Sequence, residues 1–433
     1  MKASWATKGA SSFLPCPLCK NIVQHGLAES VDGYLQHISC RGARLFDLAE
    51  PGDLFRKHDR LEAAFGTCSK KEFLEREKSM GVNFCRPGVL GDRELRQFVV
   101  PERVHTYDNM HNLLSNGAAQ WEIALLLRHL GEVGVGRETL QSFVDAAWTW
   151  PCDKARKGNM MKDAFSEHRI SSDGHYKAMA SEILVLYPLL RHLLLTVVLP
   201  TGMLQLPIRS FLALCRTLDM THGIKLQRAC SAEVLLGAIQ AHLAAFVQAY
   251  GRSEVKPKHH FELHIPSQVQ RDDGLLLDTY VQERKHQLIK RNGEKICFTK
   301  AMEQSTLARV VQDQLRELDD PGWTPGLHGR QTPFRELDLA AVAAPRLRTR
   351  SGVWVGIHDL VWADDALAQV RACAEVGGEF YVVISYLQNL RAATDFAWAG
   401  GKVARSATVV ASDRVRQTIC WTRRADGDYL VLV

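Results

Sequence analysis

The sequence lacks the segments that would direct a chain into or across a membrane. Its first 21 residues do not show the basic start and apolar run of a signal peptide. The longest apolar run, residues 183–199, is interrupted by Pro188, Arg191 and His192. We therefore expect this run to form a buried helix and not a membrane span. Internal repeats and low-complexity tracts are also missing, which argues against repeat and disordered architectures.

The chain also lacks a large net charge of either sign. The chain has 54 Lys and Arg against 48 Asp and Glu, which gives a net charge of +6 and a pI of about 8.7. This mild basic balance permits a nucleic-acid partner without requiring one. The 11 cysteines are odd in number and scattered, which favours a reduced intracellular compartment over a disulfide framework. A length of 433 residues with 46% hydrophobic residues allows two or three globular domains.

Two closely spaced pairs of metal-binding residue types lie near the N-terminus. Cys16 and Cys19 form a C-x-x-C pair, and His37 and Cys40 follow as H-x-x-C. Two thiolates one turn apart suit tetrahedral zinc, and the second pair could complete the site. Four protein ligands leave no open coordination position, so this zinc would be structural. The alternative is that the cysteines are small core residues without a metal.

Residues 104–121, VHTYDNMHNLLSNGAAQW, combine a strand-like start with a helical continuation. Apolar and polar residues first alternate, which predicts a short strand, and an apolar run at helical spacing follows. Asp108 and His111 lie where the two patterns meet. A carboxylate followed by an imidazole one turn later can hold a metal ion. The alternative is that Asp108 caps the helix and His111 packs.

The middle of the chain is predicted to be helical and then basic. Five segments between residues 121 and 250 carry apolar residues at three- and four-residue spacing. Six cations of the following stretch are candidate contacts to DNA phosphates: Lys256, Lys258, Arg284, Lys285, Lys290 and Arg291. The alternative is a solvated helix face, because three nearby aspartates weaken the positive field.

The C-terminal part has a different pattern. Residues 299–318 predict one more helix, and the turn-rich residues that follow are typical of a linker, which we place at 319–349. Residues 350–433 alternate in short apolar segments, which predicts a small β-rich domain, either a barrel or a sandwich. Its aromatic residues either form the core or recognise a partner.

Taken in order, these motifs resemble the RNase H-like DDE transposases of CACTA-type and related eukaryotic cut-and-paste elements. In those families a C-x-x-C knuckle precedes a D-x-M-H-N-L motif, which Cys16, Cys19 and residues 108–113 match. A K-P-K-x-H-x-x-L-H-x-P block follows a helical insertion and is matched by residues 256–266. Glu283, followed by Arg, matches the last catalytic carboxylate. The resemblance covers roughly residues 8–318.

The resemblance implies a fold, a partner and cofactors. It implies an α/β fold, an RNase H-like core without its first strand, with a large all-α insertion and a small β-barrel-like domain. The corresponding domains are 1–120 and 251–318 for the core, 121–250 for the insertion, 319–349 for the linker and 350–433 for the β domain. Asp108 and Glu283 would be the catalytic carboxylates that bind Mg²⁺. DNA would be the partner in the nucleus, and formation of a homo-oligomer stays open. His111 could also join Cys16 and Cys19 at the zinc ion.

One departure from the family concerns catalysis. The family's first catalytic Asp precedes the knuckle, but residues 1–15 contain no Asp or Glu. We therefore expect a transposase-derived DNA-binding protein without strand cleavage, either a fragment or a domesticated protein. One alternative is a non-enzymatic zinc-containing protein that binds nucleic acid or chromatin. Another is a helical interaction protein in which every one of these sites is structural.

Overall fold

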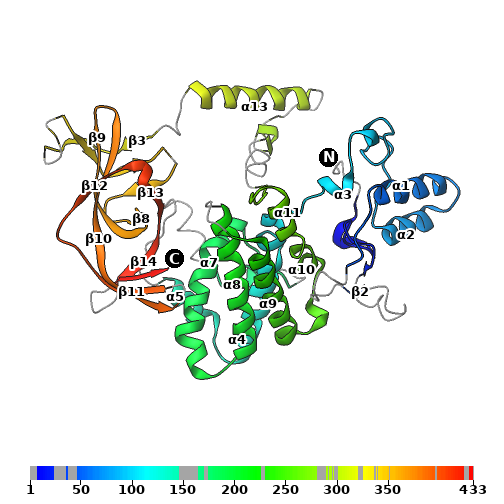
Figure 1. Ribbon diagram of the computed structural model, residues 1–433, viewed down its shortest axis with the longest axis horizontal. Coiled ribbons are helices and arrows are strands. Elements are labelled where there is room, and N and C mark those ends of the chain that lie inside the picture. Colours follow the sequence, from blue (N-terminus) through cyan, green and yellow to red (C-terminus); the bar gives the residue numbers. More distant parts are fainter. Residues whose placement is uncertain are drawn as a thin grey trace. The chain divides into compact units, whose positions relative to one another are not determined.

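The computed structural model divides the chain into two units (Figure 1). The first comprises residues 1–135, 167–187 and 193–280, and the second comprises residues 136–166, 188–192 and 281–433. The structure describes residues 7–23, 36–37, 46–145, 164–169, 174–225, 230–279, 289–290, 292–294, 296, 301–319, 325–335, 338, 340–350, 352–394, 397–423 and 429–432. Helices and antiparallel sheets occur together, so the chain is a mixed α/β protein, as expected.

The first unit is built mainly from helices. In chain order they are α1 (Asp53–Ala64), α2 (Lys70–Met80), α3 (Pro101–Val104), α4 (Ala118–Glu132), most of α7 (Ala180–Leu193), α8 (Gln205–Lys225), α9 (Ala232–Tyr250), α10 (Pro257–Glu262) and α11 (Ile265–Arg271). Local sequence signals set several of their ends. Ser69 and Glu72 form a capping box at the start of α2, and Gly81 ends that helix with a φ of +71°.

The helices predicted between residues 121 and 250 are all present. α8 packs along α9 and against α4, and Ile239, Leu243 and Phe246 of α9 are fully buried. Two helical stretches, Ala180–Thr201 and Ala232–Tyr250, are long and apolar enough to cross a membrane by length and composition. However, 56% of the apolar window of the first is buried inside the protein. This matches the buried helix expected there, since core helices share that composition.

The short strand predicted at residue 104 is wrong. Pro101 starts the helical turn α3, because its ring fixes a helical φ and its missing N–H is not needed at that position. An extended segment leads to Asp108, and the π-helical turn Met110–Leu114 precedes α4. Among the described residues of this unit, the one strand ladder is the parallel pair β1 (Ile22–Val23) and β2 (Gln36–His37).

The second unit contains α5 (Arg137–Asp145), α13 (Met302–Asp319) and the β-rich part of the chain. Its strands are β3 (Gly326–His328), β4 (Thr332–Pro333), β5 (Val342–Ala344), β6 (Arg346–Arg348), β7 (Trp354–Gly356), β8 (Leu360–Ala363), β9 (Ala366–Val376), β10 (Glu379–Thr394), β11 (Ala397–Val403), β12 (Thr408–Ala411), β13 (Val415–Thr418), β14 (Cys420–Arg423) and β15 (Tyr429–Leu432). All of their pairings are antiparallel, and one sheet runs in the order β13-β8-β9-β10-β11-β15-β14.

The β unit begins earlier than the sequence pattern indicated. Strands β3 to β6 lie within residues 319–349, which we expected to be a linker. They also contribute to the core, because Leu347 is fully buried with Val355 and Val361 in one cluster. Strands of two or three residues are too short to show a clear alternation, and Pro and Gly around them gave the region the composition of a loop.

Candidate metal centre

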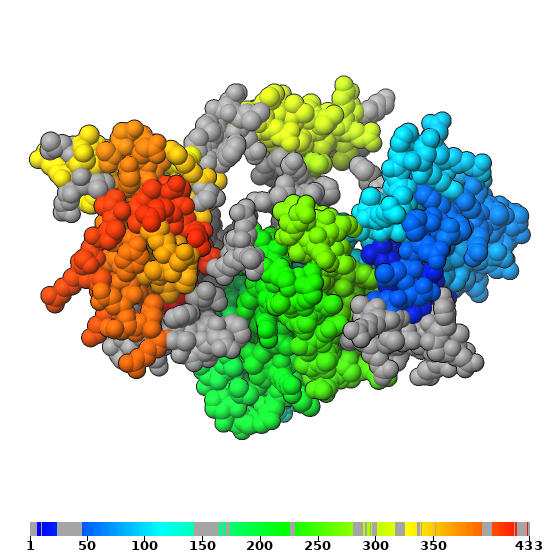
Figure 2. All heavy atoms as spheres, viewed as in Figure 1, coloured from blue at the N-terminus to red at the C-terminus, as the bar shows by residue number. Residues whose placement is uncertain are grey.

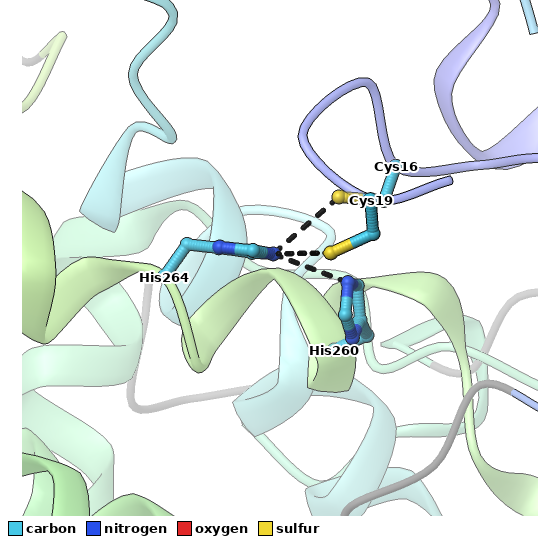
Figure 3. Close-up of side chains that lie close together, drawn as sticks. All are labelled: Cys16, Cys19, His260 and His264. Atoms are coloured by element: carbon cyan, nitrogen blue, oxygen red, sulfur yellow. Dashed lines mark hydrogen bonds between the residues drawn. The ribbon is translucent and has the colours of Figure 1, made fainter. Parts of the chain in front are cut away.

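Four buried side chains of the first unit converge in one cluster (Figure 3). They are Cys16, Cys19, His260 and His264, and one ligand atom from each lies within 4.8 Å of the others. The His264 Nε2 atom is 3.4 Å from Cys16 Sγ, 3.5 Å from Cys19 Sγ and 3.2 Å from His260 Nε2. None of the four residues is more than 7% exposed.

The distances from His264 Nε2 to the other three ligand atoms fit a zinc ion. Zn–S bonds of about 2.3 Å and Zn–N bonds of about 2.0 Å give a tetrahedron whose edges measure roughly 3.3–3.8 Å. The three distances from His264 Nε2 are within about 0.2 Å of that range, and two sulfurs with two nitrogens are a common structural zinc donor set. The cluster could therefore bind a metal such as zinc. Mg²⁺ prefers oxygen ligands and does not suit these donors.

Two local segments place the four ligands. Cys16 and Cys19 lie in a tight loop that is held by backbone hydrogen bonds from Lys20 N to Asp47 O and from Ala49 N to Leu18 O. His260 lies on α10 and His264 follows it by four residues, so both imidazoles point from the same side of the chain. Proline at the first position of α10 and at the second position of α11 helps to fix where each helix starts.

The electrostatics of the cluster favour metal binding. Burial alone would raise the pKa of Cys16, but the hydrogen bond from Cys19 and the nearby His260 and His264 bring it well below its ordinary value. The hydrogen bond with Cys16, followed by burial, raises the pKa of Cys19. Cys16 therefore loses its proton to a metal ion more readily than Cys19 does. Burial lowers the pKa of His260, which keeps its imidazole neutral and able to act as a ligand.

Aromatic residues close the cluster to water. The Tyr107 hydroxyl lies 3.1 Å from Cys16 Sγ, and its ring stacks on Phe261 with the centroids 4.5 Å apart. Phe46 meets the ring of His260 edge-on at 4.7 Å. This apolar wall lowers the local dielectric and prevents solvent from competing for the ligands.

The structure joins two of the ligands predicted from sequence to two histidines that were not predicted as ligands. Cys16 and Cys19 remain, but His260 and His264 provide the other two donors. His37 lies in β2, in register with Val23, and Cys40 is outside the described residues. Four donors are enough for a tetrahedral zinc site without either of them. The missed signal was the H-x-x-x-H spacing of residues 260–264, which places two imidazoles one helical turn apart.

His111 is also absent from the cluster, because it binds Asp108. The Asp108 carboxylate accepts hydrogen bonds from His111 Nδ1, from the backbone N–H groups of Met110, His111 and Thr279, and from the Thr279 hydroxyl at 2.8 Å. Burial would raise the pKa of Asp108, but the bonds from His111 and Thr279 lower it. Asp108 therefore connects segments 171 positions apart. Glu283, its predicted catalytic partner, lies outside the described residues.

The predicted DNA-contacting lysines that the structure describes differ in their surroundings. The Lys256 ammonium lies 4.1 Å from the centre of the Trp121 ring. Lys258 donates to the backbone oxygens of His111, at 2.6 Å, and Ser115, at 3.2 Å, and burial lowers its pKa to about 8. These two lysines therefore support the protein's own structure.

The remaining predicted DNA contacts lie further along the chain. Lys290 is exposed and lies 4.0 Å from the Glu294 carboxylate. Arg284, Lys285 and Arg291 are outside the described residues.

A second polar cluster lies in the interior of the helical unit. His242 Nε2 is 2.7 Å from a Glu122 carboxylate oxygen, and both residues are fully buried. Glu262, also fully buried, lies on α10 between the two histidine ligands, with an oxygen 3.9 Å from His242 Nδ1. Burial and the Glu122 charge raise the pKa of Glu262 well above its ordinary value. This cluster connects α4, α9 and α10.

Comparisons of the chain with protein-family models, with curated proteins and with solved structures found no match.

Proposed function

We propose that this chain is a transposase-derived DNA-binding protein whose helical unit is held together by a structural zinc ion. The observation that carries the proposal is the buried Cys₂His₂ cluster. It joins the N-terminal C-x-x-C loop to the K-P-K-x-H block, two of the motifs on which the resemblance to DDE transposases rests. Their meeting in space is what a shared scaffold requires, since only tertiary folding can bring together residues 245 positions apart.

The finer fold assignment is part of this proposal. We assign residues 1–120 and 251–318 to an RNase H-like core and the β unit to a barrel-like domain. The hydrogen bonds between Asp108 and Thr279 support the core assignment, because Thr279 is four positions before Glu283. A nuclear location follows from the DNA partner and is proposed with it.

The proposed protein binds DNA without cutting it. The Asp108 carboxylate already accepts hydrogen bonds from five donor groups, and a Mg²⁺ ion would have to displace several of them. These contacts support a structural role for Asp108, which holds the segment around residue 108 to Thr279. The zinc, when bound, supplies a cross-link, while Tyr107 and Phe46 exclude water from its ligands.

The first test is the metal content of the purified full chain. We expect one zinc per chain by mass spectrometry, and almost none after Cys19→Ser or His264→Gln. Cys85→Ser is the matched control, because Cys85 is an exposed free cysteine away from the cluster. Full zinc content in the Cys19 and His264 variants would show that the metal assignment is wrong.

The second test concerns DNA. We expect binding whose logarithm falls linearly with the logarithm of salt concentration, as counterion release requires. We expect no Mg²⁺-dependent nicking by the wild-type chain. Nicking that disappears in Asp108→Ala would refute the non-cleaving assignment, and the absence of salt-dependent DNA binding would refute the proposal itself. An experimental structure with the Asp108 and Glu283 carboxylates far beyond about 6 Å would favour a zinc-containing binding protein unrelated to transposases.

A further inference from the structure

The turn between α7 and α8 carries a long run of uncharged residues. Residues 193–208, LLLTVVLPTGMLQLPI, contain no acidic residue, no lysine or arginine and no histidine. The run covers the end of the helical stretch that begins with α7, the turn at Gly202 and the first residues of α8. In Figure 1 this turn lies at the lower end of the two helices. A run of this composition belongs in a protein core, so any part of it that faces water needs an explanation.

Four large apolar side chains of this turn do face water. The exposed fractions are 46% for Val197, 37% for Leu199, 36% for Met203 and 49% for Leu206. The other exposed residues of the turn are uncharged as well: Thr196, Pro200, Thr201, Gly202 and Gln205. In Figure 2 the green atoms of this turn lie at the lower edge of the helical unit. We call the surface formed by the four apolar side chains the apolar tip, and apolar patches of this kind mark interaction sites.

The backbone beneath the apolar tip is firmly held. Leu194, Val198 and Ile208, which alternate with the exposed residues, are at most 1% exposed and anchor both sides of the turn in the core. The Thr201 hydroxyl donates to the backbone oxygen of Val198 at 2.6 Å and accepts from the backbone N–H of Met203 at 3.3 Å. The tip is therefore ordered before any partner arrives, so binding costs little conformational entropy in the backbone.

The absence of charge decides which partner fits the apolar tip. A charged surface placed against it would lose water and gain no opposite charge, so the partner surface must itself be apolar. A lipid surface fits less well, because residues 193–208 lack the Lys, Arg, Trp and Tyr side chains that hold a protein at a bilayer interface. A second copy of the chain supplies a matching surface. A two-fold axis places the tip against itself, and without charged groups no like charges meet.

We propose that the apolar tip pairs with the apolar tip of a second copy of this chain and forms a reversible homodimer. An apolar patch on a protein surface measures about 300–600 Å², so two facing tips bury roughly 600–1,200 Å² in total. This area is at the low end for specific interfaces, where association is weak and depends on concentration. The pairing does not depend on DNA, so it goes beyond the function proposed above and can fail independently of it.

Sedimentation velocity of the full-length zinc-loaded chain, measured without DNA, tests the pairing. Between about 0.5 and 50 µM protein, the mass should rise from the 48.5 kDa of one chain toward twice that value. Leu206→Glu and Val197→Lys each bring like charges together across the two-fold axis and should raise the dimer Kd at least about 100-fold. Both changes suit their helices, because an acid near the start of α8 and a cation near the end of the preceding helix agree with the helix dipoles.

The matched control is Val234→Glu. Val234 is 54% exposed and lies in the first turn of α9, so the change again places an acid near a helix start. α9 begins only after α8 has run its 21 residues away from the tip. The dimer Kd of this variant should therefore equal that of the wild type.

Three results would overturn the proposal. A wild-type chain that stays monomeric over the whole concentration range has no such pairing. A dimer whose Kd is the same in Leu206→Glu and Val197→Lys uses another surface. A monomer that binds phosphatidylcholine vesicles, and loses this binding in Leu206→Glu, carries a lipid-binding tip instead. Raising NaCl from about 0.1 to 0.5 M should leave the dimer intact, because salt screens charges and not apolar contacts. Unchanged thermal unfolding of the variants excludes misfolding as the cause, since all three substituted side chains are exposed.

Discussion

Removal of the proposed zinc ligands should lower the stability of the helical unit by an amount that depends on the length of chain between them. Cys19 and His264 are 245 positions apart, so a metal ion bound by both closes a loop of that length. The loop-entropy relation used for disulfides gives a stabilisation of about 5 kcal/mol for such a closure. For a unit of this size, about 1 kcal/mol corresponds to a shift in Tm of roughly 2–4 °C. We therefore expect Cys19→Ser or full chelation to lower the Tm of the helical unit by about 10–20 °C.

Differential scanning calorimetry with parallel measurement of zinc content checks this expectation. Wild-type protein, chelated wild-type protein and Cys19→Ser should show the transition of the helical unit shifted, while the transition of the β unit stays in place. Cys85→Ser should retain both zinc and Tm. His37→Gln tests the ligand set expected from sequence and should also leave both unchanged. A chelated protein whose Tm falls by less than about 2 °C would refute the cross-link argument.

Three further predictions concern buried polar groups of the helical unit. In urea titrations, Lys258→Met should lower the free energy of unfolding by about 2–4 kcal/mol, because it removes two hydrogen bonds from a charged donor. The exposed control Lys290→Met should change it by less than about 0.5 kcal/mol. Burial lowers the pKa of His259 to about 3, so below pH 6.5 the unfolded chain takes up a proton that the folded chain does not. Stability should therefore fall by about 2.3 kcal/mol from pH 6.5 to 4.5, and a wild-type slope equal to that of His259→Gln at the same zinc content would contradict this. Glu122→Ala should cost about 3 kcal/mol, and a double-mutant cycle with His242→Ala should show coupling instead of additive losses.

The helices could be predicted because their signals are local. The segments that became α4, α8 and α9 each show apolar residues at helical spacing, and Ser231 caps the start of α9. The long strand β10 was likewise visible as an alternating segment. The short strands β3 and β6 were not, because packing of Leu327 and Leu347 against a distant part of the chain determines them.

The site was only half predictable for a related reason. The C-x-x-C spacing identified Cys16 and Cys19, since both thiols come from one loop. Their partners His260 and His264 lie some 245 positions away, and no periodicity relates such distant segments. His37 was chosen because it was near in sequence.

The role of a lysine was equally hard to foresee. The sequence pattern predicted Lys258 to be a surface charge. In the structure its ammonium instead donates hydrogen bonds to the backbone oxygens of His111 and Ser115. That direction depends on the tertiary fold, which the sequence pattern alone does not give.

The order in which the proposed zinc ligands appear along the chain has a consequence during synthesis. Cys16 leaves the ribosome first, and His264 follows 248 residues later. At translation rates of about 5–20 residues per second, roughly 12–50 seconds pass between the synthesis of the two thiols and that of their imidazole partners. In that interval the nascent N-terminus carries an unprotected dithiol, open to oxidation or to capture by another metal. Cellular reductants and the supply of zinc during translation should therefore influence how much of this protein matures.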